Sequence, residues 1–301
     1  MDLGLALPTY GSTASPEAII QVAEGAERIG LAAVWTFERL LRPLEPVPFG
    51  GFGPPVLLPD VYANVYDPLE TLSYVAAKTS RIRLATSVID ALFQSPVILA
   101  RRLATLDRLS GGRLVVGLGQ GWMPQEFAAA GVPPTPRGAR FQEHIEAMRA
   151  VWGPDPVRFE GRFYQIAESQ IGPKPVQPGG PPILAGAVAP ASIERAARMG
   201  LGLNPVLMSW DGLRETVETF RRAAKSAGHD PSVLPVVVRV NGSITTAPLD
   251  ERAPLTGSVE QVAEDLAQAR SLDADHVFWS MATEPAEQLA VMEQLLAQAP
   301  Q

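Results

Sequence analysis

The chain has 301 residues, 46% of them hydrophobic, which is enough to bury the core of one large domain. It contains no cysteine, so disulfides, zinc–cysteine sites and thiol nucleophiles are all excluded. The formal net charge is −7 and the 25 basic residues are scattered along the chain, which argues against nucleic acid as a partner.

The N-terminal segment Met1-Asp2-Leu3 carries no basic residue, so a secretory signal is not expected. No apolar run reaches the roughly 18 residues that a bilayer-spanning helix needs, so no membrane segment is expected either. A chain without cysteine also suits a reducing cytosol. Together these features predict a cytoplasmic protein.

Proline marks the start of several predicted helices, because its missing N–H has no partner in the first helical turn. Ser15, Asp67 and Ser95 each precede such a proline and can cap the free amides that follow. The patterns predict helices over residues 16–29, 68–79, 96–109, 137–152 and 211–227, and further helices that begin at Pro190, at Ser258 with a capping box to Gln261, and at Pro285.

Short apolar runs lie between these helices and show little alternation, as expected of strands buried on both faces of a parallel sheet. They cover residues 3–7, 33–36, 82–88, 114–118, 183–185, 203–207, 236–244 and 276–279. Strand and helix alternate about eight times, which favours an α/β protein built as a closed (β/α)8 TIM barrel over an open doubly wound sheet.

Two segments rich in proline and glycine interrupt this alternation. Residues 42–66 follow the second strand, and residues 153–182, with a predicted hairpin at 157–166, precede the fifth strand. Both are too short to be separate domains, so we predict one domain over residues 1–301 with two insertions. Long insertions in a barrel commonly serve as functional loops or lids.

Polar and small residues follow the predicted strands, at the end of the barrel where active sites of this architecture lie. Glu38 and Arg39 follow the second strand and are the candidate catalytic pair, with a surface ion pair as the alternative. Candidate cofactor-binding residues lie at the ends of the first, third, fourth and fifth strands: Thr9; Thr86, Ser87 and Val88; Gly119, Gln120, Gly121, Trp122 and Glu126; and Ala185, Gly186 and Ala187.

The glycine-rich stretch 117–121 does not lead at once into a helix, so it is not a dinucleotide fingerprint. It is either a tight turn or a place where the backbone approaches a flat ring. Residues 185–187 form either an ordinary turn before a helix or a set of free amides for a phosphate. His144, His229 and His276 are far apart in sequence and favour structural roles, and neither a catalytic triad nor a metal site is indicated.

Composition and spacing leave the reaction open, and a family resemblance narrows it. The segment from Ser110-Gly111-Gly112-Arg113 through Gly119-Gln120-Gly121-Trp122 to Arg137-Gly138-Ala139-Arg140 resembles the central signature of the luciferase-like monooxygenase superfamily. It is most similar to the branch that uses the deazaflavin coenzyme F420. The likeness extends from Gly4–Gly11 to Asp275-His276-Val277, which is nearly the whole chain.

The resemblance implies a homodimeric barrel that binds the tricyclic ring of the cofactor at its mouth. Ser87-Val88, joined by a non-prolyl cis peptide, and Gly121-Trp122 would border the ring, and residues 185–187 would lie near the phosphate. This chain has Glu38-Arg39 where many relatives have an acidic residue and a histidine, and Trp122 where some dehydrogenases have glutamate. These departures weaken an assignment as a sugar-phosphate or alcohol dehydrogenase.

The resulting hypothesis is an oxidoreductase that uses F420 for hydride transfer to or from a small organic substrate. The alternatives are an FMN-dependent monooxygenase and a non-catalytic flavin-binding protein of the same fold. Neither nucleic acid nor a membrane is expected as a partner.

Overall fold

The computed structural model describes residues 1–51 and 53–298, and it contains the alternating strands and helices that the sequence predicts. The barrel wall is made of β1 (Asp2–Ala6), β2 (Ala33–Thr36), β5 (Arg83–Thr86), β7 (Leu114–Gly119), β10 (Ile183–Ala185), β11 (Gly202–Leu203), β12 (Val237–Asn241) and β15 (His276–Ser280). The helices are α1 (Pro16–Ile29), α2 (Pro68–Ala76), α3 (Pro96–Leu109), α4 (Pro124–Ala129), α5 (Arg137–Trp152), α6 (Pro190–Arg198), α7 (Trp210–Ser226), α8 (Val259–Ser271) and α9 (Pro285–Gln298). Short strands occur in the connections: β3 (Val47–Pro48), β4 (Pro55–Val56), β6 (Ile89–Asp90), β8 (Val157–Glu160), β9 (Gln165–Ser169), β13 (Ile244–Thr245) and β14 (Gly257–Ser258).

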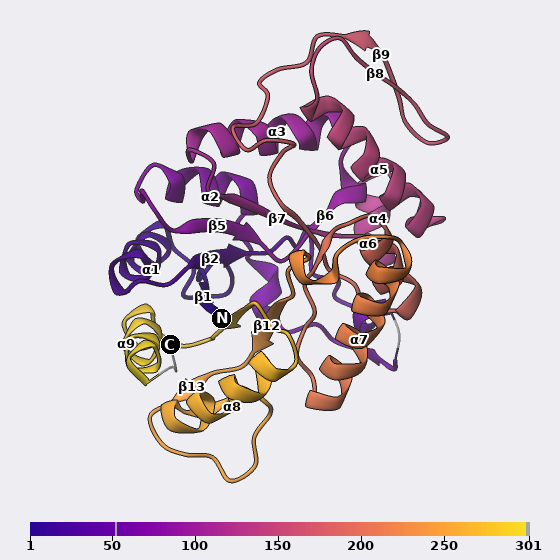
Figure 1. Ribbon diagram of the computed structural model, residues 1–301. Helices are drawn as coiled ribbons and strands as arrows, with labels where there is room; N and C mark the ends of the chain where they lie inside the picture. Colours follow the sequence, from indigo (N-terminus) through magenta and orange to yellow (C-terminus); the bar gives the residue numbers. More distant parts are fainter. Residues whose placement is uncertain (52, 299–301) are drawn as a thin grey trace.

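The parallel strands of the wall lie in the order β11, β10, β7, β5, β2, β1, β15 and β12. Parallel bridges from Leu203 to Val236 and from Val206 to Arg239 join the two ends of this order and close the ring. The helices lie around the outside of the strands (Figure 1). The fold is therefore the (β/α)8 TIM barrel that the sequence predicts.

The predicted helix starts are confirmed by their caps. Ser15 Oγ accepts a hydrogen bond from Ala18 N at 3.1 Å, and α1 ends at Gly30, whose φ of 90° suits a residue without a side chain. Asp67 and Ser95 cap α2 and α3 in the same way. The predicted capping box opens α8. These helix starts are thus determined by local chemistry.

Several boundaries differ from the sequence-based prediction. β5 ends at Thr86, and the next residues form β6, which pairs with β7. The strand predicted over 203–207 shortens to β11, because Pro205 has no N–H for a ladder. The strand predicted over 236–244 divides at Gly242 into β12 and β13. Helix α4 was not predicted, because six residues are too few to show a clear helical period.

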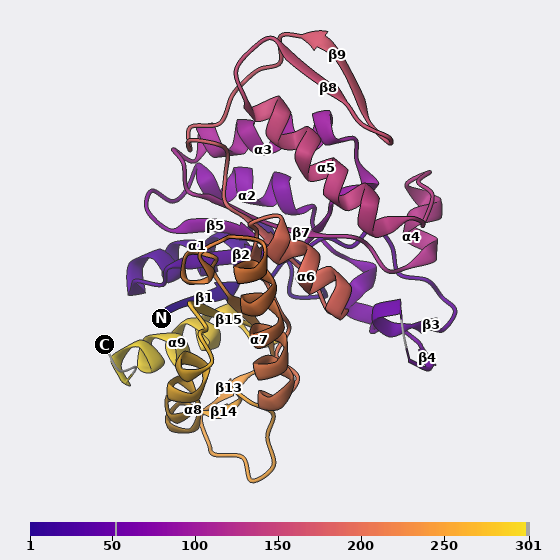
Figure 2. The same cartoon turned by 45° about the vertical axis from the view of Figure 1, so that its right-hand side comes forward.

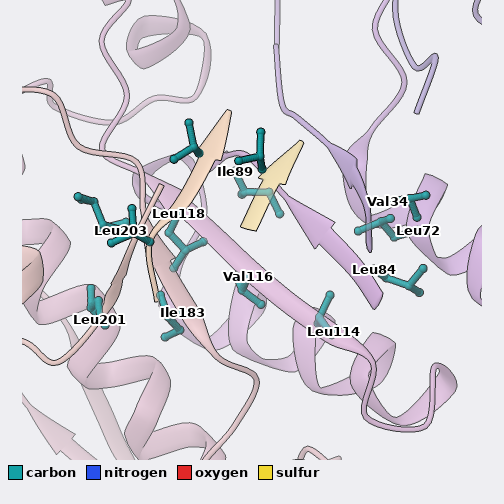
Figure 3. Close-up of a cluster of buried hydrophobic side chains, with 14 of the residues drawn as sticks. Val34, Leu72, Leu84, Ile89, Leu114, Val116, Leu118, Ile183, Leu201 and Leu203 are labelled. Atoms are coloured by element: carbon teal, nitrogen blue, oxygen red, sulfur yellow. The ribbon is translucent and has the colours of Figure 1, made fainter. Parts of the chain in front are cut away.

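Apolar side chains fill the barrel on both sides of its wall. The inner cluster consists of Ala33, Trp35, Ala85, Leu184, Val237 and Phe278. Between the strands and the helices, a larger cluster includes Leu84, Val116 and Ile183 from three neighbouring strands (Figure 3). Full burial of each large apolar side chain contributes roughly 1.5–3 kcal/mol to the stability of the folded state. The wall is therefore a rigid base from which the loops at its ends begin.

Both insertions occur where the sequence places them. In residues 42–66, the ring of Tyr62 meets that of Phe37, which follows β2, with centroids 6.1 Å apart. Residues 153–182 carry the β8–β9 hairpin, which projects beyond α5 (Figure 2). Of the helices in the described ranges, none is both long enough and apolar enough to cross a membrane.

Arg113, in the signature segment, lies at the start of β7 and joins it to the end of α2. Its Nε donates to the Ser110 carbonyl at 2.7 Å, and Nη1 donates to Thr79 Oγ1 and the Ile82 carbonyl at 2.9 Å. Nη2 donates to the Ala76 and Thr79 carbonyls at 3.1 and 3.0 Å. All five guanidinium N–H donors therefore have acceptors, which a lysine cannot reproduce.

We expect Arg113→Lys to lower the free energy of unfolding by about 2–3 kcal/mol, because several buried carbonyls lose their donors. The measurement is equilibrium urea unfolding. Arg158→Lys in the exposed hairpin is the matched control and should change stability by less than about 0.5 kcal/mol. Equal stability of the two variants would contradict this role for Arg113.

Candidate active site

The strand ends place the predicted site residues around one mouth, because the strands of the barrel wall run parallel. Glu38 N donates to the Val88 carbonyl at 3.0 Å, which joins the chain after β2 to the chain after β5. Gly186 N donates to the Leu118 carbonyl at 2.9 Å, which joins the ends of β10 and β7. Segments far apart in sequence thus form one continuous rim.

Val88 provides a fixed apolar surface on this rim. The Ser87–Val88 peptide bond is cis, as the family resemblance implies. A Cβ atom at Gly119 would lie 2.7 Å from Val88 Cγ2, and one at Gly186 would lie 2.8 Å from Val88 Cγ1. A Cβ atom at Gly117 would instead clash with the Thr86 carbonyl oxygen. Glycine at 119 and 186 therefore lets these two segments approach the valine closely, and glycine at 117 lets β7 approach the end of β5.

Other predicted cofactor residues are engaged by the protein itself. Thr86 Oγ1 donates to the Gly117 carbonyl and accepts from Gly117 N, both at 2.9 Å. Ser87 Oγ donates to Asn204 Oδ1 at 2.6 Å. Thr9 Oγ1 is buried and has no hydrogen-bond partner in the part of the chain that the structure describes. Thr86 and Ser87 thus hold strand ends, whereas Thr9 keeps an unused hydroxyl group.

Glu38 and Asp90 form a pair of buried carboxyl groups. Asp90 N donates to Glu38 Oε2 at 2.8 Å, and Gly121 N donates to Asp90 Oδ1 at 2.9 Å. Burial raises the pKa of Glu38 to about 8, and the nearby charges of Asp90, Asp67 and Glu126 add to the rise. Burial, with the charge of Glu126, also raises the pKa of Asp90 to about 6. The Glu38 carboxyl group is therefore mostly protonated at neutral pH.

Arg39 forms a buried ion pair. Its Nη1 lies 2.8 Å from Glu126 Oε2, while Glu126 Oε1 accepts from Leu40 N at 2.8 Å. The guanidinium carbon lies 5.3 Å from the ring centroid of Trp122 and 5.7 Å from that of Tyr62. The exposed fractions of the Arg39 and Glu126 side chains are 13% and 1%, so this is not a surface pair. Glu126 thus acts by holding the chain after β2.

The first turn of α6 is a better candidate phosphate site than the Gly186 amide that precedes it. The Gly186 amide is bonded to Leu118, so it is not free as the sequence interpretation requires. Ala185 is buried within β10, and Ala187 is buried after it. Ala189 gives the helix no side-chain cap, but Pro190 has no N–H and Ser192 N donates to the Ala189 carbonyl at 2.8 Å, so of the first-turn amides only that of Ala191 is left for another acceptor. Amides in this position attract anions.

Sequence reasoning missed Asn204 and Arg239, which reach into the mouth. Asn204 Nδ2 donates to the Val237 carbonyl at 2.7 Å. Arg239 Nη1 donates to the Ser87 carbonyl at 2.5 Å, across the barrel interior, because β12 and β5 are not neighbours. Spacing along β12 was the available signal for Arg239. Side chains two residues apart on a strand share a face, and Val237 belongs to the inner cluster, so Arg239 is also expected to point into the barrel.

The histidines take no part in this mouth. His276, at the start of β15, accepts a hydrogen bond from Trp35 Nε1 at 3.2 Å, and burial lowers its pKa to about 3. His144 is buried in α5 with a pKa lowered to about 4. A ring nitrogen of His229 lies 3.0 Å from the Arg198 carbonyl, after α7. All three have the structural roles that their separation in sequence favours.

A parallel barrel with its polar and glycine-rich residues at the C-terminal mouth has the architecture of an enzyme. Residues 1–254 match the family model described as luciferase-like monooxygenase, and the chain belongs to that family.

Two curated relatives and one solved structure represent the range of this family. An F420-dependent glucose-6-phosphate dehydrogenase of Amycolatopsis mediterranei is 28% identical over 301 aligned positions. The match covers 93% of this chain and 85% of the relative. An FMNH2-dependent dimethylsulfone monooxygenase of Pseudomonas putida is 29% identical over 187 residues, or 61% of this chain and 50% of the relative. The crystal structure of the monooxygenase RslO1 from Streptomyces bottropensis superimposes with a TM-score of 0.81 and 25% identity over 99% of both chains. A flavin or deazaflavin cofactor is therefore supported.

We expect the pH dependence of stability to reveal the buried Glu38 carboxyl group. Its pKa in the folded protein, about 8, exceeds the ordinary value of 4.5, so the folded state holds a proton that the unfolded chain releases. Stability from this group is present below pH 4.5 and is lost as pH rises towards 8. As pH rises from 5 to 8, the free energy of unfolding of Glu38→Gln should therefore increase by about 2–4 kcal/mol relative to that of wild type.

Urea unfolding of both proteins at several pH values measures this gain. Glu24→Gln, on the exposed face of α1, is the control and should follow wild type at every pH. Parallel stability curves for wild type and Glu38→Gln would show that the carboxyl group titrates normally.

Proposed function

We propose that this protein is an oxidoreductase that uses coenzyme F420 to transfer hydride to or from a small organic substrate. The observation that carries the proposal is the Val88 surface, which packs closely against Gly119 and Gly186 at the barrel mouth. An apolar side chain held on a rigid rim suits one face of a planar ring. The uncapped start of α6 suits a phosphate on the same ligand.

The choice of F420 over FMN is supported by the extent of similarity. The likeness to the F420-dependent relative runs over 301 residues, whereas the likeness to the FMNH2-dependent relative runs over 187. The longer likeness includes more of the strands whose ends form the mouth.

The residues of the mouth have distinct roles in this proposal. When bound, the deazaflavin supplies the hydride chemistry. Val88 supports the ring, and the first turn of α6 binds the phosphate. Glu38 keeps a proton at neutral pH and can donate a hydrogen bond or that proton. Arg39, held by Glu126 and by the rings of Tyr62 and Trp122, orients the substrate.

An FMN-dependent monooxygenase is the second candidate. The specific observation in its favour is the 29% identity with the FMNH2-dependent enzyme. The planar ring and the phosphate are common to both cofactors, so the Val88 surface and the start of α6 suit either one.

We expect F420 to bind at least about tenfold more tightly than FMN, a difference of about 1.4 kcal/mol. The measurement is fluorescence titration of the purified protein with each cofactor, followed by calorimetry. Tight binding of FMN without measurable affinity for F420 would replace this proposal with the second candidate. Absence of binding by both would overturn the cofactor assignment.

We expect Gly186→Ala to weaken cofactor binding about tenfold, because its Cβ atom would displace Val88 and overpacking costs about 1–3 kcal/mol. Val88→Ala alone should weaken binding as well, because it removes the apolar surface on which the ring would lie. Thermal melting checks that both variants fold. Unchanged affinity in Gly186→Ala would show that the ring does not lie on Val88.

A further inference from the structure

The inner layer nearest the mouth contains polar side chains where barrels usually have bulky apolar ones. Ser87 Oγ bonds to Asn204 Oδ1, and Arg239 bonds to the Ser87 carbonyl. On β15, the strand next to β12, Ser280 adds another polar group, and the hydroxyl groups of Tyr10 and Ser280 lie 3.2 Å apart. The top of the barrel interior is thus able to bind a polar group.

Arg239 is the unbalanced charge of this layer. Its Nε donates to Asn241 Oδ1 at 2.9 Å and its Nη1 donates to Ser87, both neutral acceptors. Within residues 1–51 and 53–298, no carboxylate oxygen lies within 4.0 Å of the guanidinium. Burial lowers the pKa of Arg239, the nearby Tyr62 and Tyr10 oppose this shift, and the charge of Arg39 adds to it. A buried cation without a counter-charge is costly, and a bound anion would remove that cost.

Part of the guanidinium remains available. Nη2 has no hydrogen-bond partner among the described residues, and it is not sealed from solvent. Both N–H donors of Nη2 and the second N–H of Nη1 therefore remain for a ligand, whereas Nε and the first N–H of Nη1 are engaged by Asn241 and Ser87. A purely structural arginine would not need this free edge; Arg113 uses all five of its donors.

A cluster of aromatic rings lies beside the Arg239 guanidinium. The Arg239 guanidinium lies 5.4 Å from the ring centroid of Phe37. The Tyr10 ring meets the Phe37 ring edge to face at 5.2 Å, and the Tyr62 ring lies 6.3 Å from Tyr10. These rings follow β1 and β2 or lie in the first insertion. A planar apolar body is the ligand that such rings favour.

We infer that Arg239 is an anion subsite of the active site, and that the substrate is a planar conjugated carboxylate whose charged end meets this guanidinium. The inference rests on the proposed function, since it names the substrate class of the same mouth. Arg39 cannot serve in this way, because Glu126 already neutralises it. The fork of an arginine matches the two oxygens of a carboxylate.

The test uses benzoate and benzamide, which share a planar body and differ in charge. Each is titrated calorimetrically into the full-length protein, alone and saturated with F420. We expect wild type to bind benzoate at least about tenfold more tightly than benzamide. Arg239→Gln should abolish this preference while F420 affinity stays within about threefold. Arg239→Lys keeps the charge without the fork, so a reduced preference should persist even if the glutamine variant folds poorly.

Arg149→Gln is the matched control, because Arg149 lines a cavity of about 270 Å³ at the opposite end of the barrel. It should leave the preference for benzoate unchanged. Equal binding of benzoate and benzamide to wild type would overturn the subsite. So would a parallel loss of F420 and benzoate affinity in Arg239→Gln, which would make Arg239 a support of the cofactor surface. A preference for benzoate that depends on Arg239 in a protein that binds no F420 would confirm the subsite and refute the proposed function.

Discussion

The packing of the Val88 side chain against glycines from two neighbouring strands is the contact on which the mouth depends. Because no side chain intervenes, β7 and β10 approach the end of β5 closely enough for Gly186 N to reach the Leu118 carbonyl. The Val88 carbonyl in turn accepts from Glu38 N, so the position of the candidate catalytic pair follows from the same contact. A larger residue at any of the glycines would therefore disturb the substrate side as well as the cofactor side.

The charges at the mouth follow one pattern. Arg39 is neutralised by Glu126, and Glu38 is neutral because burial keeps its proton on. Arg239 is the cation of the mouth that no carboxylate of the described protein pairs with, while Asp90, with a pKa of about 6, is an anion held by the Gly121 amide. Low polarity around a site strengthens every remaining electrostatic interaction, so one unbalanced cation there is enough to select ligands by charge. The pattern also explains why charge, rather than shape alone, is the property to vary in a substrate search.

The sequence predicts those features that depend on neighbouring residues. Ser15, Gly30 and the capping box at Ser258 define helix ends through contacts within a few residues. The site depends on pairs that only the closed barrel brings together: Arg39 with Glu126 and Ser87 with Arg239 are 87 and 152 residues apart. For that reason the sequence identifies both Arg39 and Glu126 as candidates but not the contact between them, and it does not identify Arg239. Spacing along β12 could have identified Arg239 as an inward residue, but not what it contacts.

The signature segment itself has two unlike parts. At the start of β7, Arg113 ties the strand to α2 and has no access to the mouth, so its contribution is to stability. At the far end of the same strand, Gly119 and Gly121 contact Val88 and Asp90 and so shape the site. Likeness in the first part therefore supports the fold, and likeness in the second supports a ring-binding mouth. Neither part touches Arg239, so the substrate must be inferred from residues outside the signature.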